Sequence, residues 1–600
     1  MMRARSNFRA GLSIAALFLA LLIANEAVAK DTWVRIQSKN FTLVSNASQG
    51  DARKLISKLE QFRSALSIIF PRTNLQTPVP TLVVLFKTDD DFHPFKPRVK
   101  GKIKDEVGGY FLARTHMNYV VLAVNNAALS PYEIIFHEYE HYVLHNNVNR
   151  LPVWLDEGLA EFFSSFEFSD NDRKAILGSP LVRHIYYFRQ NSIVPLKTLL
   201  AVDRKSPYYN EGRKAGMFYA ESWALVHYLM LGDDGKHQRQ MQAFINSLAE
   251  DRPVEELFKR AFQTDLKPLE EQLQSYLNRQ AFPVLKATFT DRIGVDPEIT
   301  ATVLPEAEVQ FYLGDLLAQM NLPQEAEKRL QKSLELDATL SSSEAALGLV
   351  KYWEEQPEQA KKLLRSAIEH DPNNYLAHYY LGRLLLDENN YEDAIKAYQE
   401  SIRLRPEMAF TYSGLGYAYR NAQRLDEAVT TFEQGRRRNP REEYFYRAIA
   451  YIQLERGKGE SAADYAGAYL KLRGWQDEHS PYLALVKYFA LRRAKRDAEA
   501  QKSLEDAAAQ LAPDEWPYPV IRYLNHSLSA AELLTTAGSD NDKLTEAHAY
   551  AGLELSLNGE RALALEHLHW VSANGNKNFV EYPLALAEIG RLEAAAASLR

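Results

Sequence analysis

The sequence of 600 residues contains no cysteine. Disulfide bonds, thiol catalysis, cysteine-bound zinc and a lipid attached through cysteine are therefore excluded. Stability has to come from packing, and a transition-metal site can only be built from His, Asp and Glu side chains.

Strong charge of one sign is also lacking, because the formal net charge is only -7. This balance gives no reason to expect nucleic acid or an anionic membrane surface as a partner. After the N-terminal segment, no apolar run is long enough to cross a bilayer. We therefore expect no stable membrane span once that segment is removed.

The one long apolar run lies near the N-terminus. It extends from Leu12 to Ala24, follows three arginines and ends in Ala27-Val28-Ala29. This pattern predicts a secretory signal peptide, residues 1–29, cut after Ala29. The alternative is an uncleaved membrane anchor, although a span needs roughly 20 apolar residues. A cleaved signal peptide predicts an exported protein, either periplasmic or secreted.

The rest of the chain divides into unlike parts, since 600 residues are too many for one hydrophobic core. Residues 30–280 mix strands with helices: strand-length apolar segments lie at 33–36, 41–44, 81–86 and 119–124, and helical spacing covers 52–70. The proline-containing residues 281–305 are expected to form a linker. Helical patterns follow, regular over residues 306–440 and degenerate over residues 441–600.

The regular part repeats with a period of 34 residues. A glycine, an alanine and a proline recur in fixed phase: Gly314, Gly348, Gly382 and Gly416; Ala326, Ala360, Ala394 and Ala428; Pro372, Pro406 and Pro440. This resembles the tetratricopeptide repeat, in which small residues let two helices approach closely and proline ends the second helix. The resemblance implies an all-α solenoid that binds a peptide or a partner protein.

The motif that carries chemistry is His137-Glu138-Tyr139-Glu140-His141. On a helix, residues i and i+4 share one face, so both imidazoles can bind one ion while Glu138 reaches a water beside it. Ser130 and Pro131 predict the helix start. His145 lies about 12 Å along the axis from His137 and cannot share the ion; it is expected to cap the helix or to be solvated.

A third ligand is expected from the segment Pro152–Phe162, which predicts a second helix with Glu157 and Glu161 on one face. The combined pattern resembles the gluzincin peptidases, the group of thermolysin and aminopeptidase N, and especially bacterial forms joined to tetratricopeptide repeats. The resemblance implies an α+β zincin domain in the periplasm of a Gram-negative bacterium. It also implies Zn²⁺ bound by His137, His141 and Glu157, with Glu161 supporting a zinc-bound histidine. The alternative, in which Glu161 binds the metal, stays open.

Two further segments are candidates for the same site. Gly108-Gly109-Tyr110-Phe111 corresponds to the edge strand that holds the substrate backbone in gluzincins, or else forms a turn and a core contact. Tyr219 lies on a helix resembling the one that carries the oxyanion-stabilising tyrosine of aminopeptidase-type relatives. It is otherwise a structural tyrosine, and His227 is a weaker candidate for that role.

These features together predict a zinc metallopeptidase in which Glu138 accepts a proton from the attacking water and passes it to the leaving amine. A catalytically silent scaffold that binds proteins through its repeats is the alternative. In a third reading the zinc is structural, but three protein ligands beside a glutamate base describe an open, catalytic site.

Overall fold

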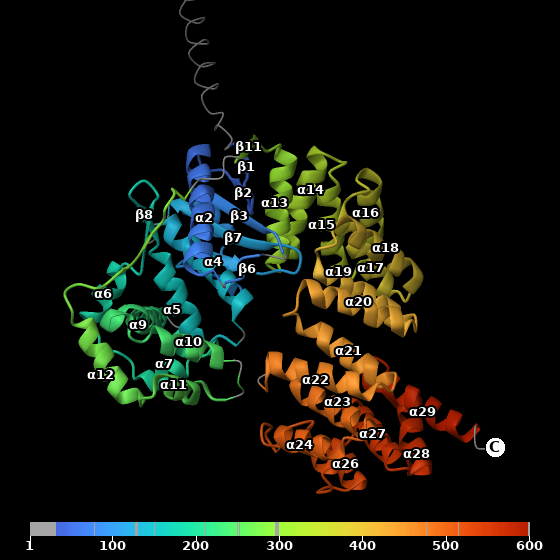
Figure 1. Cartoon of the computed structure of the whole chain (residues 1–600). Coiled ribbons are helices and arrows are strands. Elements are labelled where there is room, and N and C mark those ends of the chain that lie inside the picture. Colours follow the sequence, from blue (N-terminus) through green and yellow to red (C-terminus); the bar gives the residue numbers. More distant parts are fainter. Residues whose placement is uncertain are drawn as a thin grey trace, which may run out of the picture.

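The computed structural model describes residues 32–597, except 72, 77–78, 126–129, 149, 211, 249, 251, 294–298, 476 and 514. The predicted signal peptide, residues 1–29, lies outside the described residues. Figure 1 shows a mixed α/β domain beside a long helical solenoid. Within the described part of the chain, each helix is too short or too polar to cross a membrane.

A six-stranded mixed sheet organises the first domain. Its order is β11 (Thr300–Val303), β1 (Val34–Gln37), β2 (Phe41–Ser45), β3 (Thr81–Thr88), β7 (Asn118–Asn125) and β6 (Gly109–Leu112). Strands β2, β3 and β7 run parallel, while the remaining strands pair antiparallel. The parallel strands β3 and β7 are buried along nearly their whole length, which explains their continuous apolar sequences.

The two faces of this sheet are covered by different parts of the chain. Val83 and Leu85 of β3 pack with α2 (Gln49–Ile69) and α4 (Pro131–Asn147) in one core. The alternate residues Leu82 and Val84 pack with α13 (Glu306–Gln319), the first helix of the solenoid. The solenoid therefore supplies one layer of the first domain's core.

The expected linker at 281–305 contributes two strands instead. Strand β10 (Leu285–Thr288) pairs with β9 (Lys174–Leu177), which also pairs with β8 (Glu167–Ser169), and β11 pairs with β1 at the edge of the main sheet. Both strands are four-residue edge strands with exposed positions. Because neither contains a long apolar run, the sequence pattern did not indicate strands here and a linker was expected.

The remaining elements of the first domain are mostly helical. Close packing of α5 (Val153–Ser164) on α9 (Gly212–Leu231) requires Gly158, because an added Cβ would lie 2.5 Å from the Ser222 carbonyl oxygen. The other elements are α3 (Asp89–Phe92), η2 (His93–Phe95), β4 (Arg98–Val99), β5 (Lys102–Ile103), α6 (Val182–Phe188), α7 (Leu196–Leu200), α8 (Pro207–Asn210), η3 (Gly232–Gly235), α10 (Gln238–Ser247), α11 (Val254–Phe262) and α12 (Leu266–Leu277).

The solenoid consists of packed helix pairs, as the 34-residue period predicts. Each repeat glycine faces a large side chain of the next helix; a Cβ at Gly314 would lie 2.8 Å from Leu330, and one at Gly348 would lie 2.9 Å from Leu364. After α13 follow α14 (Pro323–Leu336), α15 (Ser341–Trp353), α16 (Pro357–His370), α17 (Tyr375–Asp387), α18 (Tyr391–Leu404), α19 (Ala409–Asn421) and α20 (Leu425–Arg438).

The described residues of the degenerate part, 441–600, are also mostly helical. It comprises α21 (Glu443–Glu455), α22 (Gly459–Arg473), α23 (Ser480–Arg493), α24 (Asp497–Ala508), α25 (Tyr518–Leu524), α26 (Ala530–Ala537), α27 (Asn541–Leu557), α28 (Arg561–Asn574) and α29 (Glu581–Ala597). The short helices α25 and α26 interrupt the regular period. The solenoid curves back toward the first domain, where Arg441 donates hydrogen bonds to the carbonyls of His145 and Asn147 at the end of α4.

Candidate metal centre

The two histidines of the motif lie on one face of α4, directed at α5. Their Nε2 atoms are 3.1 Å apart. Glu157 Oε2 of α5 lies 3.5 Å from His137 Nε2 and 3.4 Å from His141 Nε2. All three side chains are largely buried, so three potential ligand atoms converge on one point shielded from bulk water.

The dimensions of this cluster fit a zinc ion. With bonds of about 2.0–2.2 Å, neighbouring ligands of a tetrahedral ion lie about 3.3–3.6 Å apart, close to the three separations here. Glu157 Oε2 is a buried acceptor that receives no hydrogen bond from the described residues. Buried acceptors normally have a hydrogen-bond donor or a cation as partner. Because two imidazole nitrogens lie beside Oε2, the three atoms together are suited to bind a metal cation.

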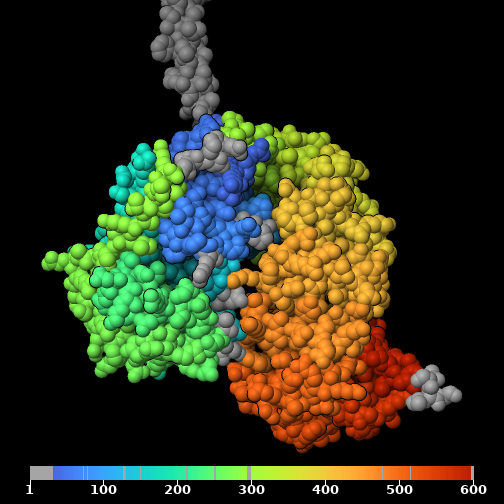
Figure 2. All heavy atoms as spheres, viewed as in Figure 1, coloured from blue at the N-terminus to red at the C-terminus, as the bar shows by residue number. Residues whose placement is uncertain are grey.

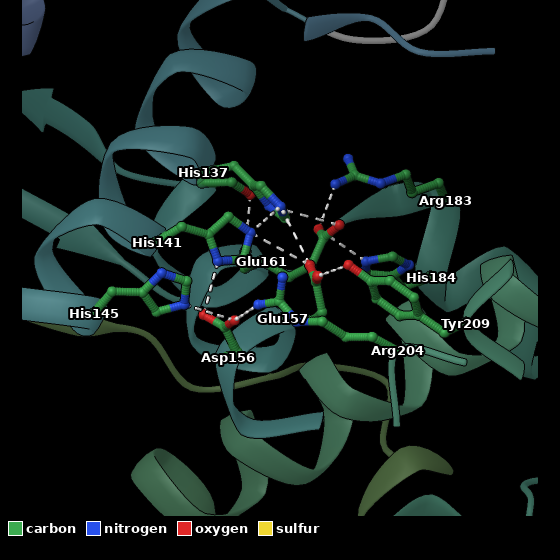
Figure 3. A network of polar contacts seen from close by, with 11 residues as sticks. His137, His141, His145, Asp156, Glu157, Glu161, Arg183, His184, Arg204 and Tyr209 are labelled. Atoms are coloured by element: carbon green, nitrogen blue, oxygen red, sulfur yellow. Dashed lines mark hydrogen bonds and ion pairs between the residues drawn. The ribbon is translucent and has the colours of Figure 1, made fainter. Parts of the chain in front are cut away.

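The carboxylate of Glu157 is anionic and held in place. Burial acts to raise its pKa, but the contacts with His137 and His141 outweigh burial and lower the pKa to about 2. The hydroxyl of Tyr209, from α8, donates a hydrogen bond of 3.0 Å to the other carboxylate oxygen, Oε1. Glu157 therefore presents one fixed oxygen to the two histidines (Figure 3).

Asp156, the residue before Glu157, orients the second histidine. Its Oδ1 bonds His141 Nδ1 at 2.8 Å, and its Oδ2 contacts His145 Nε2 at 2.9 Å and Arg204 Nη2 at 3.3 Å. Burial acts to raise the pKa of Asp156, but these bonds outweigh it and hold the pKa well below the usual range. A carboxylate on the far nitrogen of a metal-binding imidazole fixes the tautomer that presents Nε2 to the ion.

Glu161 lies at the edge of the cluster. Its carboxylate binds Arg183 Nη2 at 2.5 Å and His184 Nε2 at 3.1 Å, both from α6, and lies 3.9 Å from His137 Nδ1. The last separation is an ion-pair distance and too long for a hydrogen bond. Glu161 is absent from the converging group of ligand atoms, which contains Glu157 in its place.

Glu138 is directed at the edge strand β6. Burial raises the pKa of its carboxyl, while the neighbouring histidines and the backbone N–H of Phe111 act to lower it. Gly109 makes this proximity possible, because a Cβ there would lie 2.4 Å from Ile134 Cγ2 of α4. Strand β6 begins within the segment 108–111 and pairs antiparallel with β7 at the sheet edge, so of the two alternatives left open by the sequence the structure contains an edge strand.

The remaining candidates have different surroundings. Tyr219 of α9 lies at the site: its ring is beside that of Tyr209, and burial, together with the charges of Glu157 and Glu138, raises its pKa. His227 does not, because it is fully buried and bonds Tyr276 and the Gly178 carbonyl. It is a core histidine.

Sequence reasoning missed several residues of the site. His145 contacts Asp156 instead of only capping the helix or facing solvent. Asp156 was adjacent to a predicted ligand, but nothing in its spacing indicated the bond to His141. Tyr209, Arg183 and His184 lie 52, 22 and 23 residues from their carboxylate partners, in segments without a recognisable pattern.

Comparison with known protein families agrees with this geometry. Residues 104–279 match the Peptidase MA superfamily, and residues 345–409 and 385–452 match tetratricopeptide repeats. The chain thus carries a Peptidase MA superfamily domain followed by tetratricopeptide repeats, which confirms both predictions at this level. Among curated proteins, none matches the chain.

Many solved structures resemble parts of the chain, and three of them serve as examples. The pilF protein of Pseudomonas aeruginosa is 20% identical over 37% of this chain and 97% of its own, with a TM-score of 0.32. YrrB, described as a tetratricopeptide protein with an unusual peptide-binding site, is 21% identical over 32% and 92%, with a TM-score of 0.26. PilW, described as a type IV pilus biogenesis factor, is 11% identical over 34% and 92%, with a TM-score of 0.30.

Proposed function

We propose that this chain is a zinc-dependent peptidase of the gluzincin type, exported through its N-terminal segment, whose solenoid recruits a protein substrate or partner. The observation that carries the proposal is the convergence of His137, His141 and Glu157 within 3.1–3.5 Å of one another. The Peptidase MA match over the same residues supports it. An ion held by three protein ligands would keep one tetrahedral position for solvent or substrate.

Each residue has a distinct role in this proposal. His137, His141 and Glu157 would hold a zinc ion, which when bound would supply a Lewis acid for the carbonyl and the water. Glu138 accepts a proton from the attacking water and delivers it to the nitrogen of the leaving amine. Burial suits this task, because it raises the pKa of Glu138 and so strengthens it as a base.

Substrate would be held by two features beside these residues. Strand β6 is the last strand of the sheet, so its outer edge offers backbone groups to an extended peptide. Tyr219 would donate a hydrogen bond to the oxyanion that forms at the scissile carbonyl. Tyr209 is committed to Glu157, which leaves Tyr219 as the tyrosine for this role.

The test compares purified wild-type protein with the Glu138→Gln and His137→Ala variants. Glu138→Gln should retain zinc and lose about 10²–10⁴-fold in turnover of a casein or peptide-library substrate, since only proton transfer is removed. His137→Ala should lose the metal, measured by elemental analysis. Zinc-loaded Glu138→Gln with wild-type turnover would refute the mechanism. Wild-type protein that binds zinc but cleaves nothing would favour the silent scaffold.

A further inference from the structure

The solenoid meets the first domain at two places that differ in packing. At its start, α13 shares a continuous apolar core with β3 and β7, and Arg98 binds both carboxylate oxygens of Glu325 in α14 at 2.6 and 3.0 Å. Where the solenoid curves back, a cavity of 1310 Å³ lies between the two surfaces, which face each other in green and orange in Figure 2. Because large voids are rare in well-packed protein, this second meeting place depends more on individual polar bonds than on packing.

Arg441 supplies two of these polar bonds. It lies between α20 and α21, and its guanidinium donates hydrogen bonds to the carbonyl oxygens of His145 at 3.3 Å and Asn147 at 2.5 Å. Both carbonyls belong to the last turn of α4, where the helix itself offers no partner. A cation is also favourable there, because the C-terminal end of a helix carries a partial negative charge. A residue of the solenoid thus holds the end of the helix that carries the metal-binding histidines.

The same end of α4 contacts the metal centre. His145 Nε2 lies 2.9 Å from Asp156 Oδ2, and Asp156 Oδ1 bonds His141 Nδ1 at 2.8 Å (Figure 3). A chain of bonds therefore runs from Arg441 through the backbone and ring of His145 to Asp156, and from there to a metal-binding imidazole.

The link through His145 matters because Asp156 is buried and has few partners. The other partner of Asp156 Oδ2 is Arg204, which lies farther away at 3.3 Å and whose side chain is 64% exposed. Ion pairs with such exposed side chains contribute little, whereas a buried carboxylate needs donors that stay in place. If the end of α4 moved, Asp156 would keep its bond to His141 and lose the nearer of the two groups that hold its far oxygen.

We propose that Arg441 is a positioning residue of the metal centre, supplied by the solenoid. It fixes the end of α4, so that His145 holds Asp156 and Asp156 directs Nε2 of His141 toward the ion. This inference rests on the proposed function, because it requires a metal at His137, His141 and Glu157. A partner that draws the solenoid away from the first domain would release the end of α4 and weaken the metal site.

The alternative is that Arg441 only caps α4. A cap stabilises the helix but leaves the zinc affinity of the folded protein unchanged. His145→Ala separates the two roles, because it keeps the backbone carbonyl that Arg441 binds and removes the ring that contacts Asp156.

The test is competition for zinc between the full mature chain and a fluorescent chelator. Partners of a metal-binding imidazole typically contribute 10–100-fold to affinity, and Arg441 acts at one remove from such a partner. Arg441→Met and His145→Ala should therefore each weaken zinc binding about fivefold. Their double variant should lose no more than about the same fivefold, since both changes break one chain of bonds. Arg441→Lys should retain most of the affinity, because an ammonium still donates to the carbonyls.

Hydrogen exchange of the metal-free protein gives a second readout that needs neither zinc nor turnover. The amide of Val148 bonds the Leu144 carbonyl at the end of α4. Its exchange should be about threefold faster or more in Arg441→Met, because the last turn opens more often. In His145→Ala it should stay near the wild-type rate.

Two control variants remove an arginine of the solenoid without touching α4. Arg437→Met removes an exposed side chain of α20. Arg492→Met breaks the pair with the buried Glu554 at 2.6 Å within the solenoid, and so tests for a general loss of stability. Both variants should keep wild-type zinc affinity.

Wild-type zinc affinity in Arg441→Met, together with faster exchange at Val148, would reduce Arg441 to a helix cap. Additive losses in the double variant would show that Arg441 does not act through His145. A loss in Arg492→Met as large as that in Arg441→Met would make the effect one of stability. Each of these results overturns the inference and leaves the proposed function standing.

Failure of the proposed function would look different. Wild-type protein that binds zinc and cleaves no peptide would refute the peptidase, while the zinc affinities of the variants would still decide the role of Arg441. Wild-type protein that binds no zinc would overturn both.

Discussion

The bond between Asp156 and His141 offers the sharpest test of how the proposed metal centre is positioned. Asp156 is almost fully buried, and its Oδ1 lies 2.8 Å from His141 Nδ1. Loss of a partner of this kind typically weakens metal binding 10–100-fold, or by about 1.4–2.7 kcal/mol. Charge-assisted hydrogen bonds are roughly twice as strong as neutral ones. Asp156→Asn, which keeps a neutral hydrogen-bonding group, should therefore weaken zinc binding about tenfold, and Asp156→Ala should weaken it about a hundredfold.

Glu161 provides the contrast within the same helix. Its oxygen lies 3.9 Å from His137 Nδ1, beyond hydrogen-bond reach, and the carboxylate is bound to Arg183 and His184 instead. Glu161→Gln should therefore change zinc affinity by only about threefold, less than the effect of a bonded partner.

The assay is competition for zinc between the protein and a fluorescent chelator at neutral pH. Asp203→Asn serves as the control, because it removes an exposed carboxylate beside Arg204, the residue that contacts Asp156. Zinc affinity of Asp156→Ala within twofold of wild type would refute the positioning role. So would a larger loss in Glu161→Gln than in Asp156→Asn.

Three more predictions concern other parts of the molecule. Tyr209→Phe should weaken zinc binding about tenfold, because it removes the hydrogen bond that holds Glu157. Tyr219→Phe should keep zinc and lower kcat about 10²-fold. The opposite result for the two variants would contradict the roles given to these tyrosines. Gly158→Ala should lower the free energy of unfolding by about 1–3 kcal/mol in urea titrations, since its methyl group would meet the Ser222 carbonyl, and wild-type stability would contradict that packing. Burial raises the pKa of Glu546 in the solenoid to about 8. The folded state then keeps a proton that the unfolded chain loses above pH ~4.3, so stability falls as pH rises from there to about 8. Glu546→Gln should raise the melting temperature at pH 8 and leave it nearly unchanged at pH 4, and an equal shift at both values would disprove this assignment.

Local patterns account for what could be predicted. The motif His137–His141 and the 34-residue period each depend on residues close in sequence, where helical geometry fixes the relation between side chains. Residues 81–86 and 119–124 were recognisable as strands because both faces of a parallel strand are buried. Edge strands carry no such signal, so residues 285–288 and 300–303 were mistaken for a linker.

The sequence by itself determined the types of residue that could bind a metal, the helix that presents two of them and the repeat architecture of the second half. The tertiary structure alone decided that Glu157 and not Glu161 joins the two histidines, that Asp156 and Tyr209 hold this group, and that α13 covers the sheet. It also decided where the solenoid closes on the first domain. The physical reason is that these contacts join side chains far apart along the chain, and their positions follow from the packing of whole helices and strands.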